Sequence, residues 1–153
     1  MNAQKKIIFT KSGYEELQKK YTSLLTERVS AVEQLKKARE MGDLSENGFY
    51  KAAKQKLGSL DHDLFITKHY LRFGVVTESN SQNSIQIGSR VTVDNGQKEW
   101  EITLVGKHES NPSQNKISFI SPLGKGLLNK HIGETINIET PKGTVVYRVI
   151  QIK

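Results

Sequence analysis

Apolar residues recur at alternating spacings of three and four over residues 12–40 of this chain. Such spacing places a narrow apolar stripe along a helix, as in a coiled coil. Ser12 and Glu15 have the spacing of a capping box and predict where the helix begins. Arg28 is the one polar position, suited either to fixing the register or to keeping its charged end in water. The stripe consists of Tyr14, Leu17, Tyr21, Leu24, Arg28, Ala31, Leu35 and Ala38.

A second stripe of the same kind follows after a short break. Gly42 lies just past the first stripe, where a glycine is typical of a helix end. Because the break is short, we expect two antiparallel helices of about 28 residues and about 40 Å each, within one chain. A coiled coil between two chains is the alternative, but Gly42 in mid-pattern disfavours one continuous rod. The second stripe consists of Tyr50, Ala53, Leu57, Leu60, Leu64, Thr67 and Leu71.

The composition changes after Gly74. Residues 79–84 are polar and unpatterned, as in a linker. Short runs rich in β-branched residues follow, separated by turn signals at residues 94–96 (Asp-Asn-Gly) and 141–143 (Pro-Lys-Gly). A short helix that opens with proline is predicted over residues 122–129. The predicted strands cover residues 85–93, 100–105, 117–120, 135–138 and 144–152.

These patterns predict an α+β protein with two domains. Its first domain is an antiparallel coiled-coil hairpin, and its second is a small domain with a largely antiparallel sheet. We expect the hairpin over residues 1–76 with its tip near 41–46, a linker over 77–84, and the second domain over 85–153.

Composition and charge narrow the function classes. Hydrophobic residues make up 35% of the chain and aromatic residues 7%, which suits a thin helical rod better than one compact globule. The net charge is +7, and residues 1–74 carry an excess of five Lys and Arg, so a nucleic acid is a candidate partner of the helical half. The absence of cysteine excludes disulfides and thiol chemistry. With no secretory signal and no apolar run near about 18 residues, we expect a soluble cytoplasmic protein and no membrane partner.

The candidate chemistry lies in the break between the helices. Asp43 and Glu46 have the spacing of a capping box for the second helix, which is one interpretation. The other is that the two carboxylates share a divalent ion such as Mg²⁺ with ligands from a partner, because two ligands alone hold it poorly. Both roles are compatible. A pair this exposed is unsuited to act as an enzyme alone, but it can be delivered into the active site of another molecule.

Basic residues surround this break on both sides. They form either a solvated helix surface or a set of phosphate contacts. Phe49 falls off the apolar stripe, where an exposed aromatic ring could stack on a base. The four histidines show no metal-ligand spacing. The basic residues are Lys36, Lys37, Arg39, Lys51, Lys54 and Lys56.

Two motifs in order along the chain resemble the bacterial Gre transcription elongation factors, of the GreA/GreB type. Residues 38–47 (Ala-Arg-Glu-Met-Gly-Asp-Leu-Ser-Glu-Asn), followed by Tyr50 and Ala53, are similar to the hairpin motif of that family. Residues 117–118 and 121–130 (Ser-Pro-Leu-Gly-Lys-Gly-Leu-Leu-Asn-Lys), with 133–134 and 140–143, are similar to its second motif.

The resemblance implies an FKBP-like second domain without isomerase activity, and a monomer that is not itself an enzyme. Its hairpin enters the secondary channel of a backtracked RNA polymerase. Asp43 and Glu46 then help hold a Mg²⁺ that is shared with the polymerase active site, and they position the attacking water. The factor alone binds no Mg²⁺. The polymerase cuts the nascent RNA near its 3′ end. This RNA is contacted by the basic residues Arg39, Lys51 and Lys54, with Lys36 and Lys37 beside them. The polymerase is contacted by Ser121 and Pro122.

The chain departs from the family pattern at three points. Phe49 stands where the family usually has an acidic residue, and Ile120 where a polar residue usually precedes the Ser-Pro pair. The basic balance resembles the GreB type more than the acidic GreA type, so the subtype stays open.

Three rival functions remain at this point. A Gre-like factor that occupies the channel without stimulating cleavage is disfavoured by the presence of both Asp43 and Glu46. A general RNA-binding coiled coil would leave these acids as mere helix caps. An autonomous isomerase is disfavoured because nothing signals an apolar pocket lined by aromatic residues.

Overall fold

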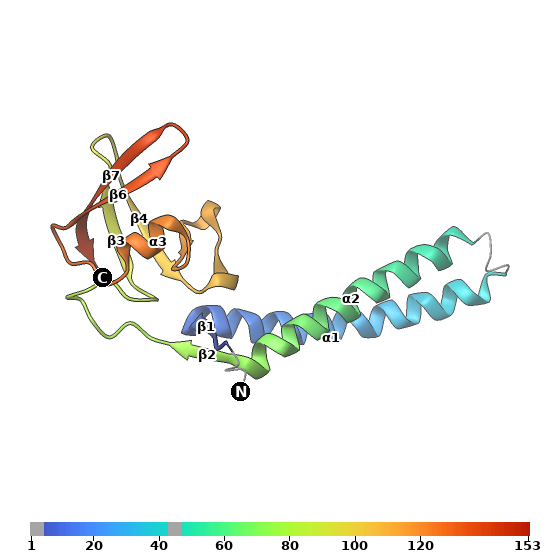
Figure 1. Ribbon diagram of the computed structural model, residues 1–153. Coiled ribbons are helices and arrows are strands. Elements are labelled where there is room, and N and C mark those ends of the chain that lie inside the picture. Colours follow the sequence, from blue (N-terminus) through green and yellow to red (C-terminus); the bar gives the residue numbers. More distant parts are fainter. Residues whose placement is uncertain (1–4, 43–46) are drawn as a thin grey trace. The chain divides into compact units, whose positions relative to one another are not determined.

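The computed structural model describes residues 5–42 and 47–153. They form two compact units (Figure 1). One unit, Tyr14–Gly74, is the helical hairpin, and the other combines residues 5–13 with Val75–Lys153. We expected residues 1–76 to belong to the hairpin, whereas the contacts group the described residues before Tyr14 with the second unit.

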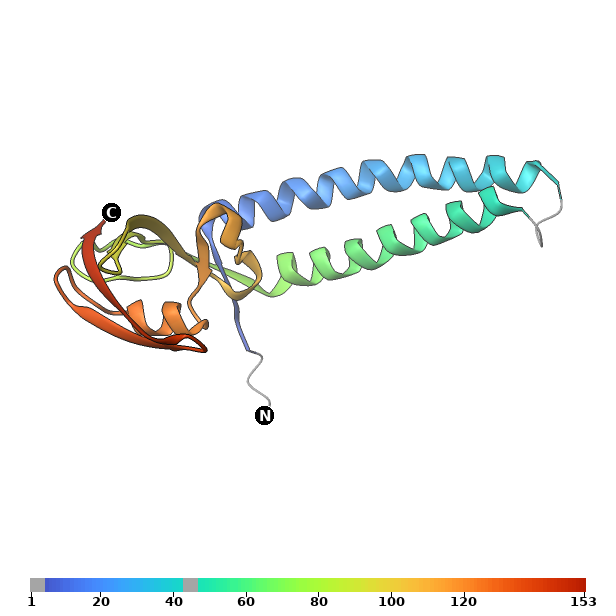
Figure 2. The ribbon, with the colours of Figure 1, turned by 90° about the horizontal axis from the view of Figure 1, so that it is seen from above.

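The hairpin is made of two helices, α1 (Lys11–Glu40) and α2 (Gly48–Phe73), which run side by side in both views (Figures 1 and 2). Early residues of α1 meet late residues of α2, because the Tyr14 hydroxyl donates to the Leu71 carbonyl oxygen at 2.9 Å. Further along, Arg28 Nε donates to Asp61 Oδ1 at 2.5 Å. The helices are therefore antiparallel partners within one chain, as predicted.

The two predicted stripes form the seam of the hairpin. From Tyr14 onward every stripe position of α1 is buried or half-buried, and every other residue of that helix is exposed. All seven stripe positions of α2 are likewise buried or half-buried. Leu24, Ala31 and Leu60 form the buried centre of this seam. Each fully buried leucine contributes about 1.5–3 kcal/mol, so packing along the seam stabilises the pair more than helix propensity does.

The helix begins one residue earlier than predicted, and the capping prediction at Ser12 and Glu15 was wrong. Both residues lie inside α1. The cap is Thr10, whose hydroxyl accepts a hydrogen bond from the Gly13 amide at 3.1 Å. Thr10 ends the preceding strand and is therefore the last extended residue before the helix. At the other end Gly42 has φ of +119°, which confirms that a glycine follows the helix end.

The second unit holds a five-stranded sheet with strand order β5-β4-β3-β7-β6. Three neighbouring pairs are antiparallel, but β4 and β5 are parallel. The sheet is therefore mixed, because two short 3₁₀ turns, η1 (Lys107–Glu109) and η2 (Pro112–Gln114), return the chain in the same direction. The strands are β3 (Arg90–Asp94), β4 (Glu99–Val105), β5 (Lys116–Ser118), β6 (Thr135–Thr140) and β7 (Gly143–Ile152).

The core of this unit lies between the sheet and α3 (Pro122–Leu127), which contacts β6 and β5. Leu127 supplies a fully buried side chain from the helix. The predicted strand over 85–93 begins only at Arg90. The chain before it does not pair with a strand, because Ile85 exchanges backbone hydrogen bonds with residues 129 and 130. The buried members of the core are Ile85, Val91, Val93, Ile102, Leu104, Leu127, Ile136, Val149 and Ile152.

Two strands were not predicted. β1 (Ile7–Thr10) and β2 (Gly74–Thr77) pair as a separate two-stranded sheet, and β1 also contacts η1. Each has four residues, too few for an alternating pattern to stand out. Over the described residues, none of the helices combines the length and apolarity that a bilayer crossing requires.

Candidate functional site

The predicted carboxylates, Asp43 and Glu46, lie outside the described residues. The structure does describe the chain on both sides of them, up to Gly42 and again from Asn47. The geometry of these flanking residues defines what surrounds the acidic segment.

Asn47 holds the two helix ends together. Its Oδ1 accepts a hydrogen bond from the Tyr50 amide at 3.1 Å, so Asn47 is the N-cap of α2. Its Nδ2 donates to the carbonyl oxygen of Ala38, in the last turn of α1, at 2.8 Å. One side chain thus satisfies a free amide of α2 and adds a second donor to the Ala38 carbonyl oxygen, which also accepts from the Met41 amide at 3.3 Å.

The cap assignment bears on one of the two interpretations of the acids, and the metal-binding one stays a prediction. α2 begins at Gly48, so the interpretation of Asp43 and Glu46 as its capping box was wrong. Asn47, three residues before the first stripe position Tyr50, is the signal that could have identified the cap. The helix start therefore does not require either carboxylate.

The predicted basic residues gather at this end of the hairpin. Three lie in the last turns of α1 and three in the first turns of α2, and all six are exposed. The Cζ atom of Arg39 lies 6.0 Å from the centroid of the Tyr50 ring, a cation–π contact between the two helices. The six are Lys36, Lys37, Arg39, Lys51, Lys54 and Lys56, and we call them the basic collar.

The helix dipole explains only two of the six collar residues, Lys37 and Arg39 in the last turn of α1. Cations near the C-terminus of α1 complement the helix dipole. Lys51 lies in the first turn of α2, where the dipole is positive and an added cation is unfavourable, and Lys54 lies in the second turn, where the dipole gives no benefit. The first turn of α2 contains no acidic residue to offset them. An anionic partner would account for their placement.

An apolar groove of about 330 Å³ lies within the collar. Sequence reasoning identified Phe49 as an exposed aromatic but missed the groove around it, because its walls come from both helices. Its apolar lining comes from Ala38, Met41, Phe49, Ala52 and Ala53.

The predicted polymerase-binding residues, Ser121 and Pro122, open helix α3. The Ser121 hydroxyl accepts from the Gly124 amide at 3.0 Å and donates to the Ser118 carbonyl at 2.7 Å. It therefore shapes the loop as an N-cap, with Pro122 at the first helical position.

Both residues line an apolar cavity of about 380 Å³ that the sequence did not reveal. Its other walls are contributed by three chain segments, and none of its lining residues is aromatic. The adjacent Ile120 is 40% exposed. The apolar and proline side chains of these walls are Pro112, Ile117, Leu123, Ile138 and Pro141.

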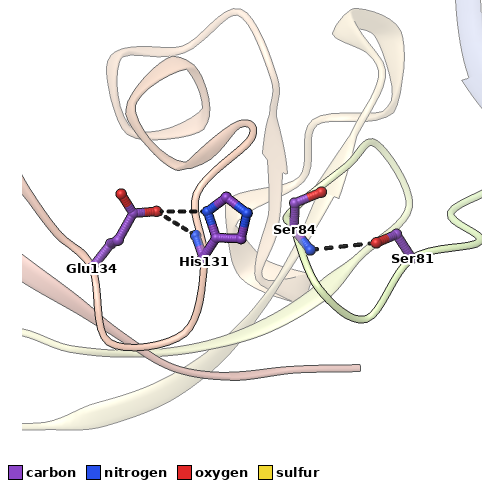
Figure 3. A network of polar contacts seen from close by, with 4 residues as sticks. All are labelled: Ser81, Ser84, His131 and Glu134. Carbon is purple, nitrogen blue, oxygen red and sulfur yellow. Dashed lines mark hydrogen bonds and ion pairs between the residues drawn. The ribbon is translucent and has the colours of Figure 1, made fainter.

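A polar contact elsewhere in this unit is a turn and not a reactive site. The Glu134 carboxylate accepts from the His131 amide at 2.6 Å and lies 3.1 Å from its ring Nδ1 (Figure 3). These two hydrogen bonds, the backbone one first, lower the pKa of Glu134. Within residues 5–42 and 47–153, no three His, Asp or Glu side chains converge as a metal site would require.

Comparisons with known proteins cover both units. Residues 7–64 match the family described as "Transcription elongation factor, N-terminal", and residues 80–153 match "Transcription elongation factor, GreA/GreB, C-term". The chain is 37% identical over 154 residues to Transcription elongation factor GreA of Thermosipho melanesiensis, covering 98% of this chain and 99% of that one. It is 35% identical over 158 residues to GreA of Staphylococcus epidermidis, covering both chains fully.

Among solved structures, GreA factor homolog 1 of Thermus thermophilus is similar, at 27% identity and a TM-score of 0.47, over 97% of this chain and 99% of that chain. The conclusion rests on the family matches and the curated relatives. Both halves of the sequence match in order and nearly end to end. The chain belongs to the GreA/GreB family of transcription elongation factors.

Proposed function

We propose that this chain is a transcript-cleavage factor that acts through RNA polymerase. The observation that supports the proposal is the hairpin end: six exposed cations lie on the two helix ends that flank the segment with Asp43 and Glu46 along the chain, and neither acid is needed as a helix cap. The hairpin is two helices thick, roughly 20 Å, because each helix with its side chains is about 10–12 Å wide. We propose that a rod of this width enters the secondary channel of a backtracked polymerase.

The two acids supply part of a metal shell and leave the rest to the polymerase. Mg²⁺ is held by hard oxygen ligands in octahedral geometry, and Asp43 and Glu46 provide carboxylate oxygens of that kind. Such an ion, when bound, lowers the pKa of water and neutralises charge developing on a phosphodiester. The residues of this chain orient the water and complete the shell. The factor therefore activates the endonuclease activity of the polymerase and has none alone.

The basic collar contacts the extruded 3′ end of the nascent RNA. Arg39, Lys51 and Lys54, with Lys36 and Lys37 beside them, neutralise phosphates at the moment the acids approach. Such contacts release counterions, so binding of the RNA end weakens as salt rises.

The second unit contacts the polymerase outside the channel. The cavity beside Ser121 and Pro122 offers an apolar surface on which a side chain of the polymerase can be anchored. We expect the factor to act as a monomer in the cytoplasm, where the polymerase works.

Stalled, backtracked elongation complexes with a labelled transcript and Mg²⁺ test this proposal. We expect prompt transcript shortening with the unmodified chain, and its loss with Asp43→Asn or Glu46→Gln. The matched control is Glu33→Gln, an exposed acid on α1 outside the acidic segment, which should cleave normally.

The same assay separates the rival functions. Tight polymerase binding with slowed elongation and no cleavage would indicate a channel-occupying regulator. Binding of free RNA that ignores both the acid substitutions and the polymerase would indicate a general RNA-binding module. Either result would overturn the proposal.

A further inference from the structure

The groove at the hairpin end combines an exposed aromatic ring with two lysines. Phe49 is 72% exposed and Met41 is 66% exposed, although both are large apolar residues. Lys37 and Lys56 line the same groove from opposite helices. Exposed apolar side chains gathered on one concave surface are typical of a binding site.

Packing does not explain the position of Phe49. The seam of the hairpin is occupied by the next residue, Tyr50, which is half-buried and touches Arg39 across the helices. Phe49 is one residue earlier and therefore about 100° round the helix from the seam. Its ring forms a wall of the groove without being covered by it.

The positive charges of the groove favour an anionic partner. In the part of the chain that the structure describes, neither Lys37 nor Lys56 forms an ion pair. These two lysines are the charged residues among those that line the groove, so the groove carries positive charge. An apolar aromatic wall next to unpaired cations complements a base attached to a phosphate chain.

The size of the groove favours one nucleotide over a protein segment. A volume of about 330 Å³ is at the lower end of small-ligand pockets. An amphipathic helix of a partner protein would need several apolar anchor sites at helical spacing. This groove offers only two large apolar side chains, Met41 and Phe49, one from each side of the hairpin end.

We propose that this groove binds one unpaired RNA nucleotide, with Phe49 stacking on the base and Lys37 and Lys56 contacting the flanking phosphates. The inference rests on the proposed function, which brings the extruded RNA to this end of the hairpin. It adds a base contact to the phosphate contacts of the collar. Stacking tolerates any base, so we expect little sequence preference.

A binding experiment tests the groove without any cleavage. The full chain is titrated with a short oligoadenylate, and with the same strand in which one nucleotide is abasic, while the NMR signals of Ala38, Met41 and Ala52 are followed. We expect the complete strand to shift these signals, and the abasic strand to bind about five- to tenfold more weakly. Equal binding of both strands would overturn the proposal.

Substitutions then separate stacking from charge. Phe49→Ala should lower affinity for the complete strand to that for the abasic strand, and Phe49→Tyr should restore it because the ring is retained. Phe65→Ala is the matched control: Phe65 lies on the same helix, is also 72% exposed, and is outside the groove. It should bind as the unmodified chain does.

Backtracked complexes place the groove in its functional setting. With Phe49→Ala, the factor concentration for half-maximal cleavage should rise about five- to tenfold when the extruded nucleotide is complete, and be unchanged when it is abasic. An equal rise on both would mean that Phe49 contacts the polymerase protein, and would overturn the proposal. If the unmodified chain failed to cleave at all, the proposed function would fail while the oligonucleotide titration still tested the groove.

Discussion

The side-chain amide of Asn47 donates a hydrogen bond to the carbonyl oxygen of Ala38 across a distance of 2.8 Å. This bond joins the first residue before α2 to the last turn of α1. The same side chain caps α2 through the Tyr50 amide. The chain entering and the chain leaving the acidic segment are thereby fixed to each other.

Replacement of Asn47 separates its two bonds. Asn47→Asp keeps an acceptor for the Tyr50 amide, since aspartate caps as well as asparagine, but removes the donor to Ala38. We expect it to reduce the free energy of unfolding of the hairpin by about 1 kcal/mol, and Asn47→Ala by about 2 kcal/mol. Urea unfolding followed by circular dichroism measures both.

Hydrogen exchange of the Tyr50 amide should stay slow in Asn47→Asp and become fast in Asn47→Ala. Equal exchange in the two variants would contradict the assignment of the cap.

The Glu109 carboxylate joins the end of strand β1 to the turn η1 within the second unit. It accepts hydrogen bonds from the amides of Thr10 and Gly106, both at 2.9 Å, and from the Thr10 hydroxyl. Glu109→Ala would leave two backbone amides without their acceptor, at a cost of about 1–3 kcal/mol for each amide that stays buried. We expect faster hydrogen exchange at Thr10 and Gly106. The control is Glu99→Ala, an exposed acid of β4, which should change stability by less than about 0.5 kcal/mol; an equal effect of both variants would refute this role.

The hairpin was predictable from sequence because its seam has one period and almost no exceptions. Fifteen stripe positions were assigned, and each one is buried or half-buried. Arg28 fits the seam because Asp61 receives its guanidinium, a contact that also raises the pKa of Arg28. The family followed from two sequence motifs, and both halves matched.

The parts that sequence reasoning missed depend on contacts between distant segments. β1 exists because it pairs with β2, some 65 residues later, and because Glu109 accepts its amide. The parallel pairing of β5 depends on two short 3₁₀ turns whose residues have no periodic pattern. The groove and the cavity each need walls from separate segments, which no local window contains. The roles of Asp43 and Glu46 in metal binding stay predictions, since these residues lie outside the described part of the chain.

Two glycines should respond in opposite directions to alanine. Gly58 is in the interior of α2, and a Cβ atom there would meet nothing within 4 Å. Gly58→Ala should therefore stabilise the hairpin by about 0.5–1 kcal/mol, through helix propensity alone.

Gly124 is buried in α3, where a Cβ atom would overlap the backbone carbonyl of Ser118. Gly124→Ala should destabilise the second unit by about 1–3 kcal/mol. Thermal unfolding of the two variants measures both effects, and a stabilised Gly124→Ala would show that α3 can move away from β5.

The turn between His131 and Glu134 should weaken in acid. Hydrogen bonds from the backbone amide and then the ring of His131 lower the pKa of Glu134 below its ordinary value. A carboxylate whose pKa is lower in the folded state stabilises that state above its unfolded pKa. This contribution is lost as the pH falls through the folded pKa, so the window lies below about pH 4.5. Because Glu134 is exposed, we expect a local effect: the His131 amide should exchange faster below this pH. The amide of Leu104, a buried core residue that donates to the Ser89 carbonyl oxygen, should be unaffected. In Glu134→Gln, the exchange rate of the His131 amide, after correction for intrinsic chemistry, should lose this pH dependence. A transition that persisted in Glu134→Gln would assign the titration to another group.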